Sequence, residues 1–294
     1  MTTSPRRPPD RVVTSCDERR DALLDLIRQA RSRITLSLFR CDDKALFTEL
    51  AEAVDRGVRV EVLVTSRAKG GKARLRKLWD SLEATGAKVH AYTDAVVKYH
   101  AKYLAVDDGP ALVTSINFTK KCFARTCDAM LITHDPDVVE GLRALMAADR
   151  DGRAAPASLP ERLIVGPERA RRQVTALIEQ ATSSIQLIDA KLSDPGLLAL
   201  LQARQAEGLR VETHGEKHLA GMKSHGKIML IDGKRAVVGS MALSALSLDF
   251  RREVAVAFDD PAAVAEIARL FRSIGSAAGA ASKTPAAAAG GASC

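Results

Sequence analysis

The sequence predicts an α/β protein assembled from two copies of the same unit. Shifting the chain against itself by 151 residues aligns eight identical residues between positions 27–60 and 178–211, which indicates an internal duplication. A second shift, of 125 residues, aligns a His, a Lys, an Asp and a Ser further along both copies. Helical and strand-like patterns alternate within each copy, as in folds where helices cover a sheet. The difference between the shifts, 151 − 125 = 26, means that the second copy lacks 26 residues of the first.

Each copy predicts the same order of elements: an amphipathic helix, an apolar strand, a second helix that ends at a glycine, and another strand. In the first copy we expect them at residues 21–30, 33–39, 44–55 and 58–64. In the second copy we expect them at residues 171–181, 184–188, 195–206 and 209–213. The predicted organisation is an N-terminal extension (1–20), a first repeat (21–150), a linker (151–160), a second repeat (161–274) and an Ala/Gly/Ser-rich low-complexity tail (275–294) that we exclude from the fold.

The composition is typical of a globular, basic protein. Hydrophobic residues make up 46% of the 294 positions, which is enough for a sizeable core. Lys and Arg number 44 against 36 Asp and Glu, and the net charge of +8 favours polyanionic partners such as nucleic acid or an anionic lipid surface. The five cysteines are scattered without paired spacing, so we expect reduced thiols. No signal peptide or membrane span is visible, and we expect a cytoplasmic location, with peripheral membrane contact left open.

Two short segments, YHAKYLAVD and SHGKIMLID, contain the candidate catalytic residues. Within each segment the His and the Lys are two residues apart on a strand-like run, so both side chains point to one face. A turn signal follows each Asp, and the returning strand of the predicted hairpin brings Ser115 or Ser240 back toward the His and the Lys. The candidate catalytic residues are His100, Lys102, Asp107, His225, Lys227 and Asp232.

These segments resemble the phospholipase D superfamily, whose HxKxxxxD motif is followed by GSxN and usually occurs twice. The resemblance extends over residues 21–272. It implies a phospholipase D-like fold, in which two α/β/α sandwich halves pack about a pseudo-twofold axis and place both motifs at one site. It also implies that one His forms a phosphohistidine while the other protonates the leaving oxygen and then activates water or an alcohol. The family more often uses the first motif for the nucleophile, which favours His100, although the residues alone leave the choice open.

The GSxN element is altered in both copies. The first copy reads TSIN, which keeps Ser115 and Asn117, and the second reads GSMA, with Ala242 where Asn is expected. The family often has a Glu further on; Glu253 fits that position in the second copy and Asp128 takes the aligned place in the first. On this resemblance the candidate substrate-binding residues are Ser115, Asn117, Ser240, Asp128 and Glu253. It also suggests that carboxylates orient the imidazoles, and which carboxylate serves which His stays open.

The residue types support this chemistry independently of the resemblance. Imidazole titrates near neutrality, so one ring can attack phosphorus while its partner acts as acid and then as base. Lys102 and Lys227 would hold the non-bridging phosphate oxygens and neutralise the charge that develops on them. We therefore expect neither a metal ion nor another cofactor.

The sequence thus predicts a phosphodiesterase that cleaves or transfers a phospholipid phosphodiester. A metal-independent nuclease is the second candidate: the 4% aromatic content disfavours single-strand stacking, but a cationic groove suffices for nonspecific binding. The third is a phosphate-binding protein with weak turnover. The basic segment 67–77 is either an arm that grips a phosphate-rich surface or a solvated helix face. No obligate protein partner is expected, and the sequence leaves the oligomeric state and the choice between hydrolysis and transfer open.

Overall fold

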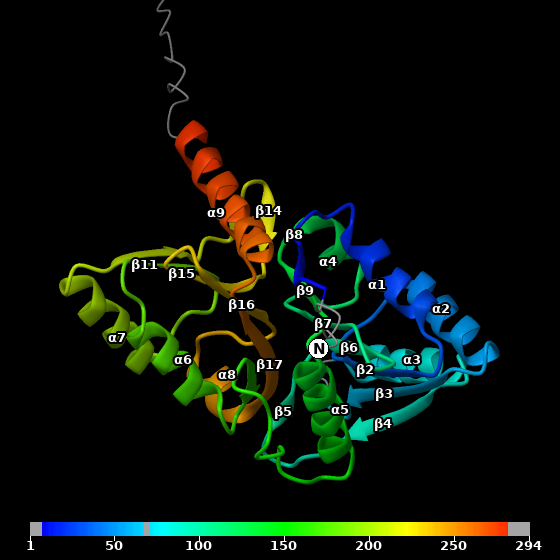
Figure 1. Cartoon of the computed structure of the whole chain (residues 1–294). Helices are drawn as coiled ribbons and strands as arrows, with labels where there is room; N and C mark the ends of the chain where they lie inside the picture. The colour runs from blue at the N-terminus through cyan, green and yellow to red at the C-terminus, as the bar shows by residue number, and fades with distance from the viewer. Residues whose placement is uncertain (1–7, 68–70, 282–294) are drawn as a thin grey trace, which may run out of the picture.

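The computed structural model describes residues 8–67 and 71–281 and shows two mixed sheets, one in each half of the chain (Figure 1). The strand order is β1-β9-β7-β6-β2-β3-β4 in the first sheet and β10-β17-β16-β15-β11-β12 in the second. The first sheet comprises β1 (Arg11–Val13), β2 (Arg33–Leu38), β3 (Arg59–Thr65), β4 (Lys88–Tyr92), β6 (Tyr103–Val106), β7 (Ala111–Thr114) and β9 (Met130–Thr133). The second comprises β10 (Leu163–Gly166), β11 (Ser184–Asp189), β12 (Arg210–His214), β15 (Lys227–Ile231), β16 (Arg235–Gly239) and β17 (Arg251–Phe258).

The two sheets correspond strand for strand, except that the first has an additional edge strand, β4. This strand and the helix before it, α3 (Lys72–Glu83), account for the segment that the second copy lacks. The predicted duplicated α/β fold is confirmed. The other helices are α1 (Arg19–Gln29), α2 (Lys44–Asp55), α4 (Lys120–Arg125), α5 (Pro136–Arg150), α6 (Ala170–Glu179), α7 (Pro195–Ala206), α8 (Ala245–Phe250) and α9 (Pro261–Ala281).

The helices α2 and α7 begin and end with the same local chemistry. Asp43 accepts hydrogen bonds from the first backbone N–H groups of α2, and Asp194 does the same for α7. Each helix is followed by a glycine at positive φ, Gly57 at 82° and Gly208 at 98°, a conformation that glycine adopts without strain. These signals explain why the expected boundaries of both helices match the observed ones.

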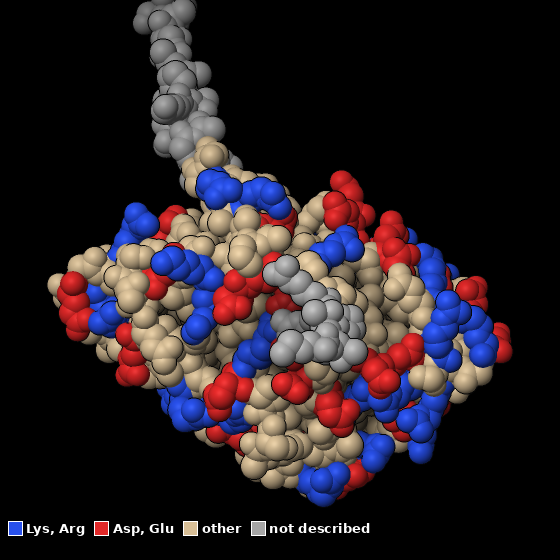
Figure 2. All heavy atoms as spheres, in the orientation of Figure 1, with Lys and Arg blue, Asp and Glu red and all other residues tan. Residues whose placement is uncertain are grey.

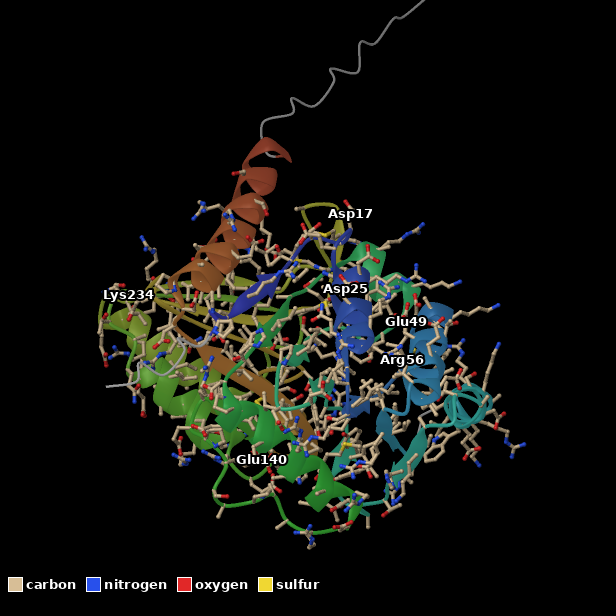
Figure 3. The ribbon with its side chains drawn as sticks, turned by 45° about the vertical axis from the view of Figure 1, so that its right-hand side comes forward. Asp17, Asp25, Glu49, Arg56, Glu140 and Lys234 are labelled. Atoms are coloured by element: carbon tan, nitrogen blue, oxygen red, sulfur yellow. The ribbon has the colours of Figure 1, made fainter. Side chains whose placement is uncertain are left out.

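Helices cover the outer face of each sheet, and a third core lies between the sheets. In the first half, α1 and α2 pack against each other; Figure 3 shows Asp25 and Glu49 on these neighbouring helices, and both carboxylates accept hydrogen bonds from Arg28. In the second half, α6 and α7 take the equivalent places (Figure 1). The central core combines apolar residues of both sheets with those of α5 and α9. The two halves are therefore joined by a continuous apolar interior.

The chain ends differ from the predicted organisation. The expected N-terminal extension contributes β1, the edge strand of the first sheet, which pairs with β9, and a three-residue strand is too short to give a periodic signal. At the other end, α9 continues past residue 275 to Ala281, because the alanines that make this segment low in complexity are also strong helix formers. Residues 282–294 lie outside the described residues, as do Lys69 of the basic segment and Cys294. The four described cysteines are free thiols.

Two short parallel pairings exchange strands between the halves. In the first half, β5 (Lys98–Tyr99) pairs with the beginning of β17, at Arg251 and Arg252. In the second half, β14 (Met222–Ser224) pairs with β8 (Thr126–Cys127) of the first half. The strand β14 also forms a hairpin with β13 (His218–Leu219). Because β5 and β14 run directly into the two HxK segments, each of these segments begins against the opposite half.

The surface mixes both signs of charge. Figure 2 shows Lys and Arg gathered at the right-hand edge, where α2 and α3 lie, with acidic side chains interspersed elsewhere on this face. Within residues 8–67 and 71–281, no helix combines the length and the apolar character that crossing a bilayer requires.

Candidate active site

The first candidate histidine, His100, is held by the second half of the chain. It follows β5, and its backbone N–H donates to the carbonyl of Arg252 at 3.0 Å. Its imidazole Nδ1 lies 2.9 Å from Oε2 of Glu253, a side chain that is fully buried in β17. The pairing of β5 with β17 therefore places a carboxylate of the second half against a histidine of the first.

The second histidine, His225, shows the reciprocal arrangement. Its Nδ1 lies 3.1 Å from Oδ1 of Asp128, which is fully buried and belongs to the first half. The next residue, Gly226, donates its N–H to the carbonyl of Cys127 at 2.8 Å. A Cβ at position 226 would lie 2.9 Å from that same carbonyl, so the close approach of the two chains favours glycine. The structure thus answers the question that the sequence left open, because each histidine is served by the carboxylate of the other half.

These contacts fix which ring nitrogen is available for chemistry. An ionised carboxylate only accepts hydrogen bonds, so Nδ1 of each imidazole carries the proton. The pKa of Glu253 is held at about 2: burial alone would raise it, but His100 outweighs that effect. The pKa of Asp128 is also lowered, because His225 outweighs burial. The Nε2 atom of each ring is thereby left with a lone pair or a transferable proton.

Serine hydroxyls hold the two carboxylates in place. Ser115 donates to Oδ1 of Asp128 at 2.6 Å. On the opposite side, Ser247 of α8 donates to Oε1 of Glu253 at 2.8 Å, while Ser240 donates to the neighbouring backbone carbonyl of Val254 at 3.3 Å. The sequence reasoning did not identify Ser247, because its Ser-x-x-Ser spacing indicates only the beginning of a helix. Both carboxylates are therefore fixed by at least one hydroxyl besides the imidazole.

Both lysines are buried beside their histidines. Lys102 Nζ donates to the backbone carbonyl of His100 at 2.5 Å, and Lys227 Nζ donates to that of His225. Lys102 is fully buried and Lys227 is 7% exposed. In the described part of the chain, no Asp or Glu forms an ion pair with either lysine. Buried ammonium groups without a carboxylate in direct contact are costly, and an anionic ligand would add to the attraction that Glu253 exerts on Lys102 from a distance.

The charged groups of the two motifs lie close enough to affect one another's pKa. Burial lowers the pKa of His100 to about 4, and Lys227 of the other half contributes to the decrease. Burial likewise lowers the pKa of His225, with a contribution from Lys102. The pKa of Lys102 itself falls to about 7, because burial and the charge of Lys227 both disfavour its ammonium form. Each lysine therefore acts on the histidine of the other motif.

This geometry is matched by a known family. The model of the PLD-like domain of cardiolipin synthase matches residues 23–150 and 213–274, more than half of the chain. The chain belongs to the phospholipase D superfamily. The family predicted from the two HxKxxxxD segments is thus confirmed.

One curated relative and two solved structures match the chain over different lengths. Cardiolipin synthase A of Pseudomonas aeruginosa is 30% identical over 129 residues, which cover 43% of this chain and 26% of that protein. The matched region therefore spans about a quarter of the curated relative. Polyphosphate kinase of Porphyromonas gingivalis superimposes with a TM-score of 0.73 at 20% identity, over 89% of this chain and 46% of the other. Phosphatidylserine synthase of Haemophilus influenzae Rd KW20 superimposes with a TM-score of 0.69 at 12% identity, over 90% of this chain and 86% of the other. At these identities the two structural likenesses show the fold alone.

The aspartates of the HxKxxxxD motifs lie away from the histidines. Asp107, at a φ of 44°, accepts backbone hydrogen bonds at 2.8–2.9 Å from residues 31–33, where α1 leads into β2. Asp232, at a φ of 55°, binds residues 182–184 in the same way. Burial alone would raise the pKa of Asp107, but these hydrogen bonds hold it at about 2. In both halves the motif aspartate therefore ties the hairpin to the preceding helix.

The altered GSxN elements keep part of their geometry. A Cβ at Gly239 would lie 2.3 Å from the carbonyl oxygen of Val254, which accounts for the glycine kept in GSMA. In TSIN, Thr114 donates to the carbonyl of Ala129 at 3.1 Å. The side chain of Asn117 is half-buried, and its Oδ1 has no hydrogen-bond partner among the described residues. Substrate contact by Asn117 stays a prediction.

One aromatic side chain makes the two sides of the site unequal. Phe39, at the end of β2, packs against the imidazole of His100 with 4.9 Å between ring centroids, and Lys102 Nζ lies 5.3 Å from its ring centroid. The aligned position in the second copy is Ala190, which has no ring to offer. Correspondingly, the His100 side chain is 13% exposed and that of His225 is 26% exposed. Phe39 gives no functional signal in the sequence, because an apolar residue at a strand end predicts only core packing.

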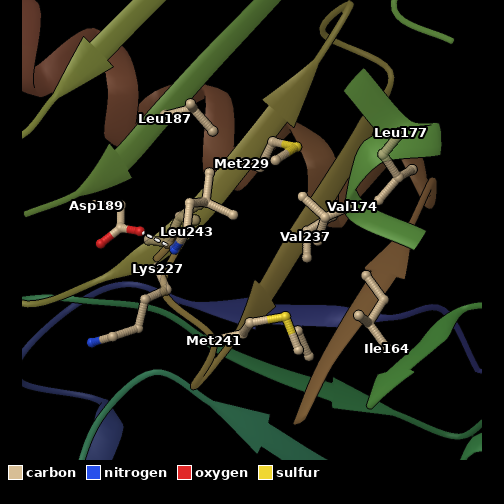
Figure 4. Close-up of a pocket in the computed structure, with 12 residues that line it drawn as sticks. Ile164, Val174, Leu177, Leu187, Asp189, Lys227, Met229, Val237, Met241 and Leu243 are labelled. Carbon is tan, nitrogen blue, oxygen red and sulfur yellow. Dashed lines mark hydrogen bonds between the residues drawn. The ribbon is translucent and has the colours of Figure 1, made fainter. Parts of the chain in front are cut away.

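A small cavity lies behind the site in the outer core of the second half. Its volume is about 30 Å³, and Figure 4 shows Lys227 at its edge with the ammonium group reaching away from the apolar lining. Asp189, also at the edge, accepts a hydrogen bond from the backbone N–H of Leu243 at 2.6 Å. Leu243 and Ala255 line the cavity where the first half has the larger Phe118 and Met130. The cavity thus results from smaller side chains at repeated positions.

The described residues contain no group of three or more His, Cys, Asp and Glu arranged to hold a metal ion.

Proposed function

We propose that the protein is a phosphodiesterase that cleaves or transfers a phospholipid phosphodiester through a phosphohistidine on His100. One arrangement carries this proposal: two imidazoles, each tied through Nδ1 to a buried carboxylate, lie beside Lys102 and Lys227, neither of which forms an ion pair with an Asp or Glu of the described residues. Such a set provides a nucleophile, an acid and two cations for one phosphate. The name of one relative, cardiolipin synthase A, supports a phospholipid as the substrate.

The smaller exposure of His100, 13% against 26% for His225, and its lowered pKa support it as the nucleophile. With a pKa of about 4, its imidazole is neutral near pH 7 and its Nε2 lone pair can attack phosphorus. As the N–P bond forms, the bond from phosphorus to the leaving oxygen breaks, and His225, protonated at Nε2, gives that oxygen its proton. Asp128 and the negative charge of the substrate favour this protonated form of His225.

The second step reverses the proton transfer. His225 takes a proton from water or from an alcohol, the resulting oxygen attacks phosphorus, and the N–P bond breaks to return neutral His100. Lys102 and Lys227 hold the non-bridging oxygens throughout. In this scheme Asp128, Glu253, Ser115 and Ser240 are positioning residues, because all four are fully buried. The motif aspartates Asp107 and Asp232 likewise act through the fold.

Headgroup release from mixed phospholipid vesicles, in the presence of a chelator, tests the proposal. We expect release by the wild type and by His134→Ala, a control histidine outside the site, and none by His100→Ala. With a p-nitrophenyl phosphodiester, whose leaving group needs no acid, His225→Ala should accumulate an acid-labile phosphoenzyme and His100→Ala should not. If the phosphoenzyme accumulates in His100→Ala and not in His225→Ala, the roles of the two histidines are reversed.

The same preparation separates the alternatives. Cleavage of DNA by the wild type, without headgroup release, would contradict the lipid substrate and support the nuclease. Binding of a phosphodiester without turnover of either substrate would support the phosphate-binding protein.

A further inference from the structure

Two short helices that occupy equivalent places in the two halves border the site. The helix α4 ends at Arg125, three residues before Asp128, which holds His225. The helix α8 ends at Phe250, three residues before Glu253, which holds His100. Because three residues span at most roughly 11 Å, the ends of both helices lie next to the catalytic groups.

The exposed faces of these two helices have opposite chemistry. The shift of 125 residues aligns Lys121 with Leu246 and Arg125 with Phe250. On α4 both positions are exposed cations. On α8 they are apolar side chains that are 42% and 50% exposed. Since positions i and i+4 share a helix face, the exposed face of α4 presents two positive charges and that of α8 presents two apolar groups.

A third exposed apolar residue joins α8 at the same edge. Val96 is 68% exposed and lies two residues before Lys98, which pairs in parallel with Arg251, the residue after Phe250. The backbone N–H of Val96 donates to Oδ1 of Asp94 at 2.8 Å, so hydrogen bonding holds its loop in place. We call Val96, Leu246 and Phe250 the apolar rim.

The concentration of these residues at one place calls for a partner. The described part of the chain has four exposed large hydrophobic residues, and three of them form the apolar rim; the fourth, Leu198, is on α7. Large apolar side chains gathered beside a site mark a contact surface. A nucleic acid, which presents phosphates along its whole length, would favour cations on both sides of the site. The exposed faces of α4 and α8, one cationic and one apolar, instead match an amphiphile with an anionic surface.

We propose that the apolar rim and the cations of α4 form a docking surface for bilayers that contain anionic phospholipid. The apolar rim enters the boundary between headgroups and acyl chains, and Lys121 and Arg125 contact anionic headgroups. This inference deepens the proposed function, on which its link to catalysis rests.

Cosedimentation with vesicles tests the docking surface directly. The probes are vesicles of phosphatidylcholine mixed with phosphatidylglycerol, compared with phosphatidylcholine alone. We expect Leu246→Ser/Phe250→Ser to bind the mixed vesicles at least roughly tenfold more weakly than the wild type, and the matched control Leu198→Ser to bind equally well. Lys121→Glu/Arg125→Glu should remove the preference for phosphatidylglycerol. Undiminished binding by the Leu246→Ser/Phe250→Ser variant would overturn the proposal.

Turnover of a monomeric short-chain phospholipid separates docking from chemistry. Leu246→Ser/Phe250→Ser should retain wild-type turnover of the monomeric substrate and lose most of its turnover of vesicles. Equal loss on both substrates would overturn the docking role, because a membrane contact cannot affect a substrate free in solution. If the wild type binds vesicles through the apolar rim but turns over no phospholipid, the proposed function fails and the docking surface stands.

Discussion

Glu253, the carboxylate of the second half that contacts His100 of the first, provides the sharpest test of the proposed chemistry. In Glu253→Gln, the side chain keeps its shape and an oxygen that can accept from Nδ1 of His100 at about the present distance of 2.9 Å, but it loses its charge. As His100 bonds to phosphorus, its ring becomes positive. A unit charge about 4 Å away, at an effective dielectric constant of about 20, contributes about 4 kcal/mol. Allowing for the remaining neutral hydrogen bond, we expect a loss of about 3 kcal/mol, or roughly 100-fold in kcat.

The assay is kcat for a soluble p-nitrophenyl phosphodiester, measured for wild type, Glu253→Gln and Ser247→Ala. The serine variant keeps the charge but loses one hydrogen bond to it, so its decrease should be no more than roughly tenfold. A folded Glu253→Gln protein with kcat within threefold of the wild type would refute the role of the carboxylate in stabilising the charged imidazole.

Three further predictions follow from the pKa values. Phe39→Ala admits water to His100, so the pKa of His100 should rise from about 4 toward 6.5. The acidic limb of the pH profile of kcat/KM should then move to higher pH. An acidic limb at the wild-type pH would contradict this prediction. Phosphate affinity of the wild type should fall as pH rises through about 7, where Lys102 loses its proton, and Lys102→Arg should abolish that decline in a binding titration. Asp107→Asn should lose about 1–2 kcal/mol of unfolding free energy in urea at pH 7, with the pH profile of catalysis unchanged. Because its folded pKa is lowered to about 2, this contribution is present above the unfolded value of 3.8 and is lost as pH falls toward 2, which urea titrations at several pH values can check.

The sequence predicts those parts of the fold that depend on local signals. The helices α2 and α7 have apolar periodicity, an N-terminal Asp and a C-terminal Gly, and their bounds match the expectation. The hairpins that follow His100 and His225 were expected from alternation and turn residues. The strand β1 was missed because three residues carry no period.

The contacts within the site depend on long-range pairing, which a single sequence does not reveal. The contact of His100 with Glu253 joins residues 153 positions apart, through a two-residue strand. The location of Asp107 likewise depends on a backbone turn at positive φ that brings residues 31–33 to its carboxylate. Residue types and spacing indicate the chemistry of such a site, whereas its connections follow from how the two sheets pack.

The exchange of β5 and β14 between the halves has a consequence for biosynthesis. When the first half has emerged and folded alone, His100 has no acceptor for its Nδ1 proton, because Glu253 belongs to a strand not yet made. Asp128 at that stage holds no imidazole, since His225 also comes later. The two histidine–carboxylate pairs are therefore completed only when the last strand of the second sheet docks, so a nascent or truncated first half lacks both pairs.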